Sequence, residues 1–237
     1  MKLVKCIVRP DFVAEVTAAL EQVGVSGITV TDVYDKLGHR GVVTPRVHFD
    51  EVRVPAANLL GQAGRPGKRI VTGAFSWTAA LIGAACVGTM RAAFEYALEF
   101  ARSEKRLGTV PVIEHQNVGF MLADIKMRIE ACRYLTWKAC HDLERSGGRA
   151  EELAIMTKVY CSEAAVDTVY DCMRVVGIAS YTKDLAPLER IMRDAMVFPL
   201  YDGGNQGMRR RQLHDILRHP GYDSMLAARG EGLPEDQ

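Results

Sequence analysis

The chain has 237 residues, of which 48% are hydrophobic and 25% are charged, and these proportions are ordinary for a soluble globular protein. Thirty basic residues against twenty-nine acidic ones leave a formal net charge of +1, and no stripe interleaves aromatic with basic residues. The composition therefore gives no support for nucleic-acid binding. The length allows one large domain, or one domain with a smaller unit attached to it.

The cysteines, the histidines and the apolar runs further limit the class of protein that this sequence can encode. Six cysteines lie scattered in the sequence without a C-x-x-C pair or a zinc spacing, so we expect reduced core residues. The six histidines form no ligand set, and no metal site is predicted. The apolar start is too short for a signal peptide, and the run TAALIGAACVGTM is shorter than a membrane span. We therefore expect a cytoplasmic protein without a membrane-spanning segment.

The N-terminal segment is predicted to form a β-α-β unit over residues 1–33. Residues 2–8 are predicted to form a strand that Pro10 ends, and apolar residues at helical spacing predict a helix beginning at Asp11. Residues 27–33 are predicted to form the second strand. Such a unit is half of a ferredoxin-like fold, and no second half follows it in the sequence.

Residues 34–66 are predicted to form a short β segment. The alternation of Val47, Phe49, Val52 and Val54 predicts two short strands joined by a turn. The loop GQAGRPGK follows this segment. It separates the β segment from a helical remainder.

From about residue 67 to residue 237 the chain is predicted to be helical. Apolar spacing and the breaks between apolar stretches predict helices over residues 68–104, 113–146, 150–176, 186–199 and, shorter, 206–218. Long amphipathic helices joined by short loops are typical of an antiparallel four-helix bundle. The expected fold is therefore mainly α, with the bundle preceded by the β segment and the β-α-β unit.

Two stretches of the sequence resemble the acyl-CoA dehydrogenase superfamily. KLGHRG and VHFDEVRVPAANLLG, followed by long helices, resemble the end of that family's middle β domain and its C-terminal helical bundle. RDAMVFPLYDGGNQGMRR resembles the segment that carries the family's catalytic base. The resemblance covers roughly residues 35–220. It implies an FAD-dependent oxidoreductase with a small-molecule substrate, which forms a homo-oligomer, a tetramer that shares flavin sites between subunits.

Departures from the family pattern resemble its nitroalkane oxidase branch. Asp202 stands in place of the usual Glu, Ala79 in place of an arginine, and Glu104 in place of an arginine that contacts the flavin phosphates. Only Gly177 remains of a glycine-rich segment. Together with the motifs DGGN, RRRQ and EHQ, these departures imply proton abstraction from a nitroalkane, with electrons passing to the flavin and then to dioxygen.

Asp202 is the candidate catalytic base. Proton abstraction needs a carboxylate that the backbone can aim, and Gly203 and Gly204 permit backbone angles that other residues resist. Because the C–H bond of a nitroalkane is more acidic than that of a thioester, an aspartate can replace a glutamate. Arg209 is expected to pair with Asp202 and to keep it ionised and oriented. The alternative is a turn aspartate, since Asp-Gly pairs are common in turns.

The resemblance also implies residues that contact the cofactor. Ser76 would hydrogen-bond the flavin ring and joins Asp202 and Arg209 as a catalytic candidate; its alternative is a bond back to its own helix. Gln116 would contact the dinucleotide half of FAD, or else lie at the surface. The full set of cofactor-binding candidates is Ser76, Gln116, Arg174, Gly177, Gly203, Gly204 and Asn205.

The first 33 residues resemble a different family. They are similar to the opening β-α-β of the nitrogen-regulatory PII family, although that family's effector loop and second half do not follow. Three functions therefore stay open. The first is a nitroalkane oxidase-like flavoenzyme, and the second an acyl-CoA dehydrogenase acting on a thioester. The third is a non-catalytic oligomerising or PII-like signalling module, since the N-terminal domains of the dehydrogenase family are absent from this sequence.

Overall fold

The chain divides into two compact units, Met1–Ile70 and Val71–Gln237. The computed structural model describes residues 18, 28–50, 52, 55–61 and 67–234. In chain order its elements are β1 (Ile28–Val33), β2 (Pro45–Phe49), η2 (Ala56–Asn58), α2 (Lys68–Ser103), η3 (Val112–Glu114), α3 (Gln116–Ser146), α4 (Glu151–Val176), η4 (Gly177–Tyr181), α5 (Leu188–Ala195), η5 (Gly204–Arg209), α6 (Arg210–Leu217) and α7 (Leu226–Arg229).

The first unit contains a two-stranded antiparallel sheet. Strands β1 and β2 pair with Ile28 opposite Phe49 and Val33 opposite Pro45. The prediction of a strand over residues 27–33 is therefore confirmed, as is that of a strand around Val47.

Other elements predicted for the first unit cannot be compared with the structure. The strand over residues 2–8 and the helix from Asp11 lie outside the described residues, apart from position 18, which is helical. The short strand predicted around Val54 also lies mostly outside them. The boundary between residues 33 and 34 therefore stays a prediction.

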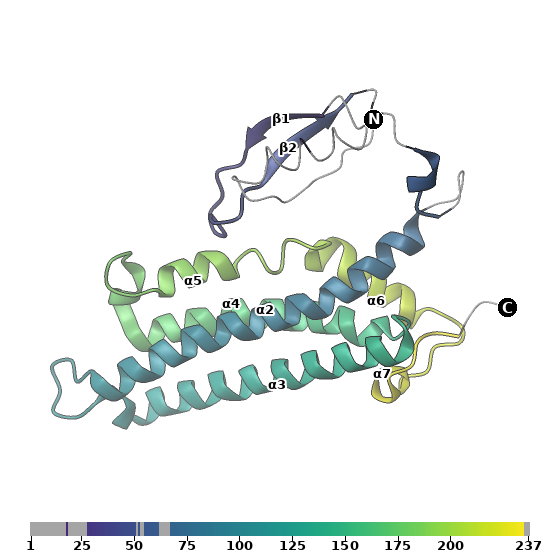
Figure 1. Ribbon diagram of the computed structural model, residues 1–237. Coiled ribbons are helices and arrows are strands. Elements are labelled where there is room, and N and C mark those ends of the chain that lie inside the picture. The colour runs from purple at the N-terminus through teal and green to yellow at the C-terminus, as the bar shows by residue number, and fades with distance from the viewer. Residues whose placement is uncertain (1–17, 19–27, 51, 53–54, 62–66, 235–237) are drawn as a thin grey trace. The chain divides into compact units, whose positions relative to one another are not determined.

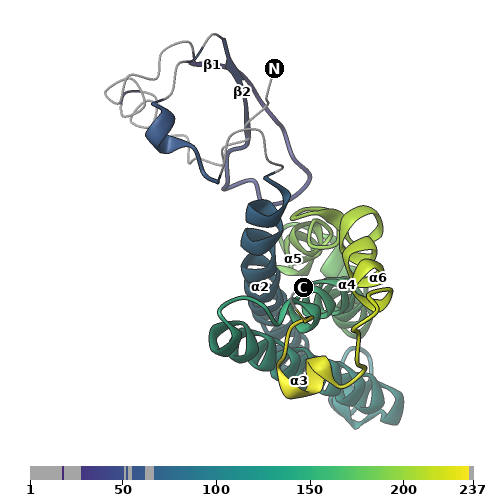
Figure 2. The same ribbon diagram turned by 90° about the vertical axis from the view of Figure 1, so that its right-hand side faces the viewer.

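The second unit is an antiparallel helical bundle. Helices α2, α3, α4 and α5 lie side by side and alternate in direction, and Figure 2 shows them from a view turned by 90° (Figures 1 and 2). Helices α6 and α7 follow α5 at one end of the bundle (Figure 1). The expected mainly α fold with a four-helix bundle is confirmed.

Glycines end two of the long helices where the sequence predicts breaks. Gly147 follows α3 with φ 62°, and Gly177 follows α4 with φ 77°. Both angles are positive, and glycine adopts them at little cost because it has no Cβ atom. Helix α5 is shorter than the predicted 186–199, and the helix predicted over 206–218 begins as the π-helix η5.

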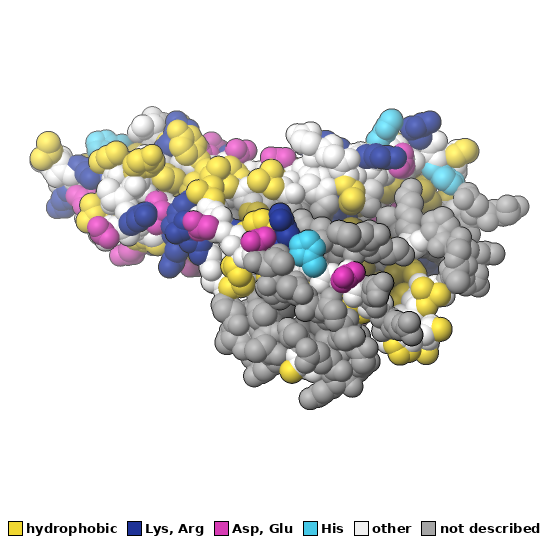
Figure 3. All heavy atoms as spheres, turned by 90° about the horizontal axis from the view of Figure 1, so that it is seen from above, with side chains coloured by type: hydrophobic (Ala, Val, Ile, Leu, Met, Phe, Trp, Pro, Cys, Tyr) yellow, Lys and Arg dark blue, Asp and Glu magenta, His cyan; other side chains and the backbone are white. Residues whose placement is uncertain are grey.

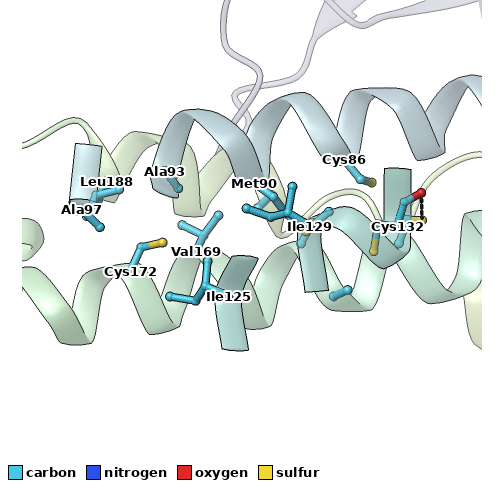
Figure 4. Close-up of a cluster of buried hydrophobic side chains, with 14 of the residues drawn as sticks. Cys86, Met90, Ala93, Ala97, Ile125, Ile129, Cys132, Val169, Cys172 and Leu188 are labelled. Atoms are coloured by element: carbon cyan, nitrogen blue, oxygen red, sulfur yellow. Dashed lines mark hydrogen bonds between the residues drawn. The ribbon is translucent and has the colours of Figure 1, made fainter. Parts of the chain in front are cut away.

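The core of the second unit is built from inward faces of α2, α3, α4 and α5. Small residues of α2 alternate with Met90, and they meet Ile125 and Ile129 of α3 and Val169 of α4 (Figure 4). Side chains drawn there include Cys86, Met90, Ala93, Ala97, Ile125, Ile129, Cys132, Val169, Cys172 and Leu188. Burial of these apolar surfaces is the main force that holds the helices together.

The cysteines largely follow the expectation of reduced core residues. All five described cysteines are free thiols, and four of them are buried. Cys140 is exposed, so the core assignment is wrong for this one. Its position follows from the α3 periodicity, because Ala139 and Leu143 point into the bundle and Cys140 does not.

The apolar stretch of helix α2 extends beyond the run TAALIGAACVGTM. By length and composition alone, residues Ile70–Ser103 would suffice to cross a membrane. Core helices of soluble proteins share this property, and Ala79, Met90 and Ala97 of α2 are fully buried within the second unit. On the face seen in Figure 3, exposed hydrophobic side chains lie among charged ones.

Candidate active site

The candidate base lies on a turn of unusual backbone conformation between α5 and α6. Asp202, Gly203 and Gly204 all have positive φ angles, of 51°, 91° and 54°. Glycine adopts such angles readily, and Asp is one of the few other residues that tolerate the left-handed region. The expectation that the two glycines supply special backbone angles is confirmed, and Asp202 itself shares the left-handed conformation.

Gly203 also leaves space that a neighbouring side chain uses. A Cβ atom at this position would lie 2.9 Å from Met208 Sδ and 3.3 Å from Arg209 Nε, whereas one at Gly204 would meet no described atom within 4 Å. The glycine thus lets the arginine side chain fold back over the turn. The π-helix η5 follows directly, and π-helical turns are frequent at functional sites.

Asp202 and Arg209 form an ion pair inside the second unit. Arg209 Nη2 lies 2.6 Å from Asp202 Oδ2, and Arg209 Nε donates to the backbone carbonyl of Asp202 at 2.9 Å. The arginine side chain is 0% exposed and the aspartate side chain 11%. One guanidinium therefore fixes both the carboxylate and the backbone of the same residue, as a planar fork of donors can.

Both terminal nitrogens of Arg209 make further contacts. Arg209 Nη2 donates to the backbone carbonyl of Phe75 at 3.0 Å, and Nη1 donates to Gln212 Oε1 at 3.2 Å. The guanidinium carbon lies 5.3 Å from the centre of the Phe75 ring. These contacts compensate the cost of burying the charge.

Thr78 completes the contacts of the carboxylate. Its hydroxyl lies 2.9 Å from Asp202 Oδ1, the oxygen that Arg209 does not hold. The residue lies on α2, one turn after Phe75, so the same stretch of α2 touches both members of the ion pair. The sequence reasoning missed Thr78, and the only signal for it was a hydroxyl residue three positions after Phe75 in an apolar helix.

A second buried network anchors the residue that follows the turn. Lys158 Nζ of α4 donates to Asn205 Oδ1 at 2.7 Å, and Asn205 Nδ2 donates to Ser162 Oγ at 2.8 Å and to Glu163 Oε1 at 2.9 Å. Asn205 is 1% exposed, and both polar atoms of its amide are bonded within the chain. It therefore positions the turn, and its amide donates both protons to the chain itself.

Lys158 carries a fully buried ammonium group that is electrostatically linked to the Asp202–Arg209 ion pair. Burial and, to a smaller extent, the positive charge of Arg209 together lower the pKa of Lys158 to about 8. The negative charge of Asp202 opposes this change. The sequence reasoning also missed Lys158, whose only signal was a lysine at an inward position of the apolar stretch AIMTKVYCSEAA.

Ser76 lies two residues before Thr78 on α2 but faces away from Asp202. It is 0% exposed, and its hydroxyl lies 3.0 Å from the Thr72 carbonyl and 2.9 Å from Glu151 Oε2. Because residues two apart on a helix point in different directions, Ser76 faces α4 while Thr78 faces Asp202. The bond back to its own helix, which was the alternative for Ser76, is present.

The other cofactor candidates lie away from Asp202. Gln116 begins α3, Arg174 lies in the last turn of α4, and Gly177 ends that helix, all at the end of the bundle away from α6 (Figure 1). Gln116 and Arg174 are exposed, and Arg174 forms an ion pair with Asp171 at 3.2 Å. The structure thus brings Asp202, Arg209 and their turn together and separates them from these three.

The arrangement around Asp202 suits proton abstraction. A carboxylate that is largely shielded from water, and oriented by a guanidinium and a hydroxyl, can accept a proton on its remaining lone pairs. Among the described residues, no group of three or more metal-binding side chains is found.

Family profiles match two parts of the chain. The profile described as "Acyl-CoA dehydrogenase, C-terminal domain" matches residues 65–217, which include the whole candidate site. The profile described as "Nitrogen regulatory protein P-II" matches residues 1–60. The two resemblances noted in the sequence are therefore confirmed, and the second runs beyond residue 33.

Individual relatives are similar over most of this chain and about half of their own. The nitroalkane oxidase of Podospora anserina is 44% identical over 197 residues, which are 81% of this chain and 45% of that protein. The cyclohexane-1-carbonyl-CoA dehydrogenase of Geobacter metallireducens is 36% identical over 192 residues, 81% of this chain and 50% of that protein. The chain thus spans about half the length of the curated relatives it matches.

Solved structures lead to the same family. The structure of Podospora anserina nitroalkane oxidase superposes with a TM-score of 0.83 at 40% identity, covering 90% of this chain and 50% of the other. Butyryl-CoA dehydrogenase from Megasphaera elsdenii gives a TM-score of 0.76 at 29% identity, covering 83% and 50%. Through the bundle that carries Asp202 and Arg209, the chain belongs to the acyl-CoA dehydrogenase family.

Proposed function

We propose that this chain carries the substrate-deprotonating part of an FAD-dependent oxidoreductase of the nitroalkane oxidase type. The single observation that carries the proposal is the buried Asp202–Arg209 pair, held on a left-handed turn at 2.6 Å. The similarity to nitroalkane oxidases supports the choice of a nitroalkane as substrate.

In this proposal Asp202 removes the α-proton of the substrate. Arg209 pairs with the carboxylate and orients it before the transfer. The proton moves from the substrate carbon to a carboxylate oxygen, and the electron pair of the C–H bond stays on the substrate as a carbanion. FAD, when bound, supplies an acceptor for the two electrons that leave the substrate.

The residues present fit such a cofactor only in part. Gln116 and Arg174 are exposed and would hold it through an amide and a guanidinium. Ser76 and Asn205 are buried with their polar groups engaged by the chain itself, so in this conformation they offer no donor to a flavin. The backbone of Gly203 and Gly204 stays accessible in part.

An acyl thioester is the second candidate substrate, because the relatives include acyl-CoA dehydrogenases. Ala79 argues against it. By the family resemblance an arginine stands at this position in acyl-CoA dehydrogenases, and here Ala79 is 0% exposed within a cluster of buried apolar residues. The packing around it leaves no room for the longer side chain, so the departure is built into the core.

The proposal includes a homo-oligomer in the cytoplasm. Large apolar side chains lie exposed on α3, among them Phe120, Met127, Tyr134 and Trp137, and self-association would remove such a surface from water. A tetramer and a cytoplasmic location follow the family resemblance and the composition. The third candidate, a non-catalytic module, is the outcome that remains if no flavin binds.

The test is a visible absorption spectrum of the purified chain with added FAD, recorded before and after nitroethane in the absence of oxygen. We expect bound flavin that bleaches with nitroethane and does not bleach with butyryl-CoA. Bleaching with butyryl-CoA alone would select the thioester instead. A chain that retains no flavin would contradict the enzyme proposal and support the non-catalytic module.

Two variants assign the base in the same assay. Asp202→Asn removes the carboxylate with little change in shape and should abolish bleaching while flavin remains bound. Asp215→Asn is the matched control, because Asp215 is an exposed aspartate of α6 outside the site. An Asp202→Asn variant that bleaches as fast as this control would remove Asp202 from the reaction.

A further inference from the structure

The two oxygens of the Asp202 carboxylate have different partners. Oδ2 is held by Arg209, and Oδ1 lies 2.9 Å from the hydroxyl of Thr78. The arginine contact places a positive charge beside the carboxylate. It does not explain how the carboxyl group is held after it has taken up a proton, when its attraction to the arginine is weaker.

The Thr78 hydroxyl has a second acceptor within reach. It lies 3.2 Å from the backbone carbonyl of Phe75, one turn earlier on α2, and this carbonyl also accepts from Arg209 at 3.0 Å. A hydroxyl has one proton to donate and can accept as well. With Asp202 ionised, the shorter, charge-assisted bond to Oδ1 is the stronger of the two choices.

We propose that Thr78 is a positioning residue that holds Asp202 in both of its protonation states. The inference rests on the proposed function, in which Asp202 gains a proton from the substrate. Before the transfer, the Thr78 hydroxyl donates to Oδ1 of the carboxylate. After it, the hydroxyl accepts a hydrogen bond from the protonated Oδ1 and donates its own proton in a hydrogen bond to the Phe75 carbonyl.

The exchange requires rotation of two O–H bonds, that of the protonated Asp202 carboxyl toward Thr78 and that of Thr78 toward the Phe75 carbonyl. The proton balance is closed, because one proton passes from the substrate carbon to Asp202 and Thr78 keeps its own throughout. Both acceptors already lie within hydrogen-bond distance, so neither the turn nor α2 has to move. An environment arranged before the reaction in this way avoids the cost of rearranging during it.

The helix that carries Thr78 is placed to serve this role. Phe75 and Thr78 are three residues apart on α2 and so lie on one face of the helix, and between them they contact both Arg209 and Asp202. This face of α2 therefore holds the ion pair as one unit, although Thr78 and Asp202 are 124 residues apart in sequence.

The test follows the Asp202 carboxyl carbon by ¹³C NMR through a pH titration of the full chain, with Asp202→Asn identifying the signal. Thr78→Val removes the hydroxyl at nearly the same volume, so we expect the carboxyl to take up its proton about one pH unit higher, because the charge-assisted bond lost from the ionised form is stronger than the bond lost from the protonated form. Thr78→Ser restores the hydroxyl and should titrate like the unmodified chain.

The matched control is Thr89→Val, which removes a hydroxyl from the same helix. Thr89 donates to the Ala85 carbonyl at 3.0 Å and is not in contact with the site, so the Asp202 signal should not move. If Thr78→Val fails to fold, Thr78→Ala is measured in its place. A Thr78→Val or Thr78→Ala titration equal to that of Thr89→Val would overturn the inference.

The result of the Thr78 titration can be distinguished from the result that tests the proposed function. A shifted titration in Thr78→Val, combined with flavin bleaching that survives Asp202→Asn, would confirm the hydrogen bond and reject Asp202 as the base. An unshifted titration with bleaching lost in Asp202→Asn would leave the base in place and reject the role of Thr78.

Discussion

Two arginine–aspartate pairs in the second unit show what burial adds to the same chemistry. Arg209 and Asp202 approach to 2.6 Å with side chains 0% and 11% exposed, whereas Arg174 and Asp171 approach to 3.2 Å with side chains 58% and 21% exposed. The family resemblance in the sequence implied a site role for both arginines. Only the first pair is shielded from water, and it alone is joined by a hydroxyl, a carbonyl and an aromatic ring.

The difference follows from the cost of removing charge from water. An exposed pair gains little, because water already solvates both groups and salt screens them. A buried pair must satisfy every donor, and losing one partner leaves an uncompensated charge. The many contacts of Arg209 are therefore a condition for placing a carboxylate at this position.

The largest expected effect separates the two pairs directly. Arg209→Met should lower the free energy of unfolding by about 3–5 kcal/mol, because Asp202 would remain buried without its partner. Arg174→Met should cost less than about 1 kcal/mol, because the pair it breaks is exposed. Urea unfolding of both variants measures the two values. Equal losses in the two variants would show that burial does not distinguish these pairs.

The next effect concerns the pH dependence of stability. Lys158, like Arg209, is a buried basic residue. Its pKa is lowered to about 8 in the folded chain, mainly by burial and then by Arg209, whereas Asp202, Cys86 and Glu163 act in the opposite sense. Between about pH 8 and its ordinary pKa of 10.5, the unfolded chain binds more protons than the folded one.

Stability from this group should therefore rise with pH across that window and stay flat below it. Each pKa unit corresponds to about 1.4 kcal/mol, so the gain is on the order of 3 kcal/mol at most. Lys158→Met is the reference, and the difference between the two unfolding curves isolates the lysine from other groups that titrate there. A difference that does not change between pH 7 and pH 10.5 would contradict a lowered pKa for Lys158.

The smallest effect tests the turn that brings Arg209 to Asp202. Gly203→Ala should destabilise the chain by about 1–3 kcal/mol, because φ is 91° and the added Cβ would crowd Met208 and Arg209. Gly204→Ala is the matched control with a positive φ and open space, and should cost only about 1 kcal/mol. Thermal unfolding ranks the two, and the reverse order would rule out crowding at Gly203.

Much of the second unit could be predicted from local sequence. Helices α2, α3 and α4 match the predicted ranges to within a few residues, because apolar spacing and the glycines at residues 147 and 177 act over one or two turns. The acid-glycine-glycine turn and the arginine seven residues later are likewise local, and the pairing of Asp202 with Arg209 was expected from them.

The contacts that complete the site could not be predicted in this way. Thr78 and Lys158 reach the turn from α2 and α4, and their hydroxyl and ammonium groups look like any others in an apolar helix until the helices pack. Ser76 was predicted from the family resemblance alone, and a resemblance does not show that this side of the helix meets Glu151.

The sequence by itself determined the helical periodicity, the breaks between helices and the chemistry of the Asp202 turn, since each depends on neighbours within a few positions. Only the tertiary structure decided which ion pair is buried, and which hydroxyl and ammonium groups lie beside it. The physical reason is that burial and electrostatic environment are properties of the packed bundle, in which groups 124 residues apart in sequence come within 2.9 Å.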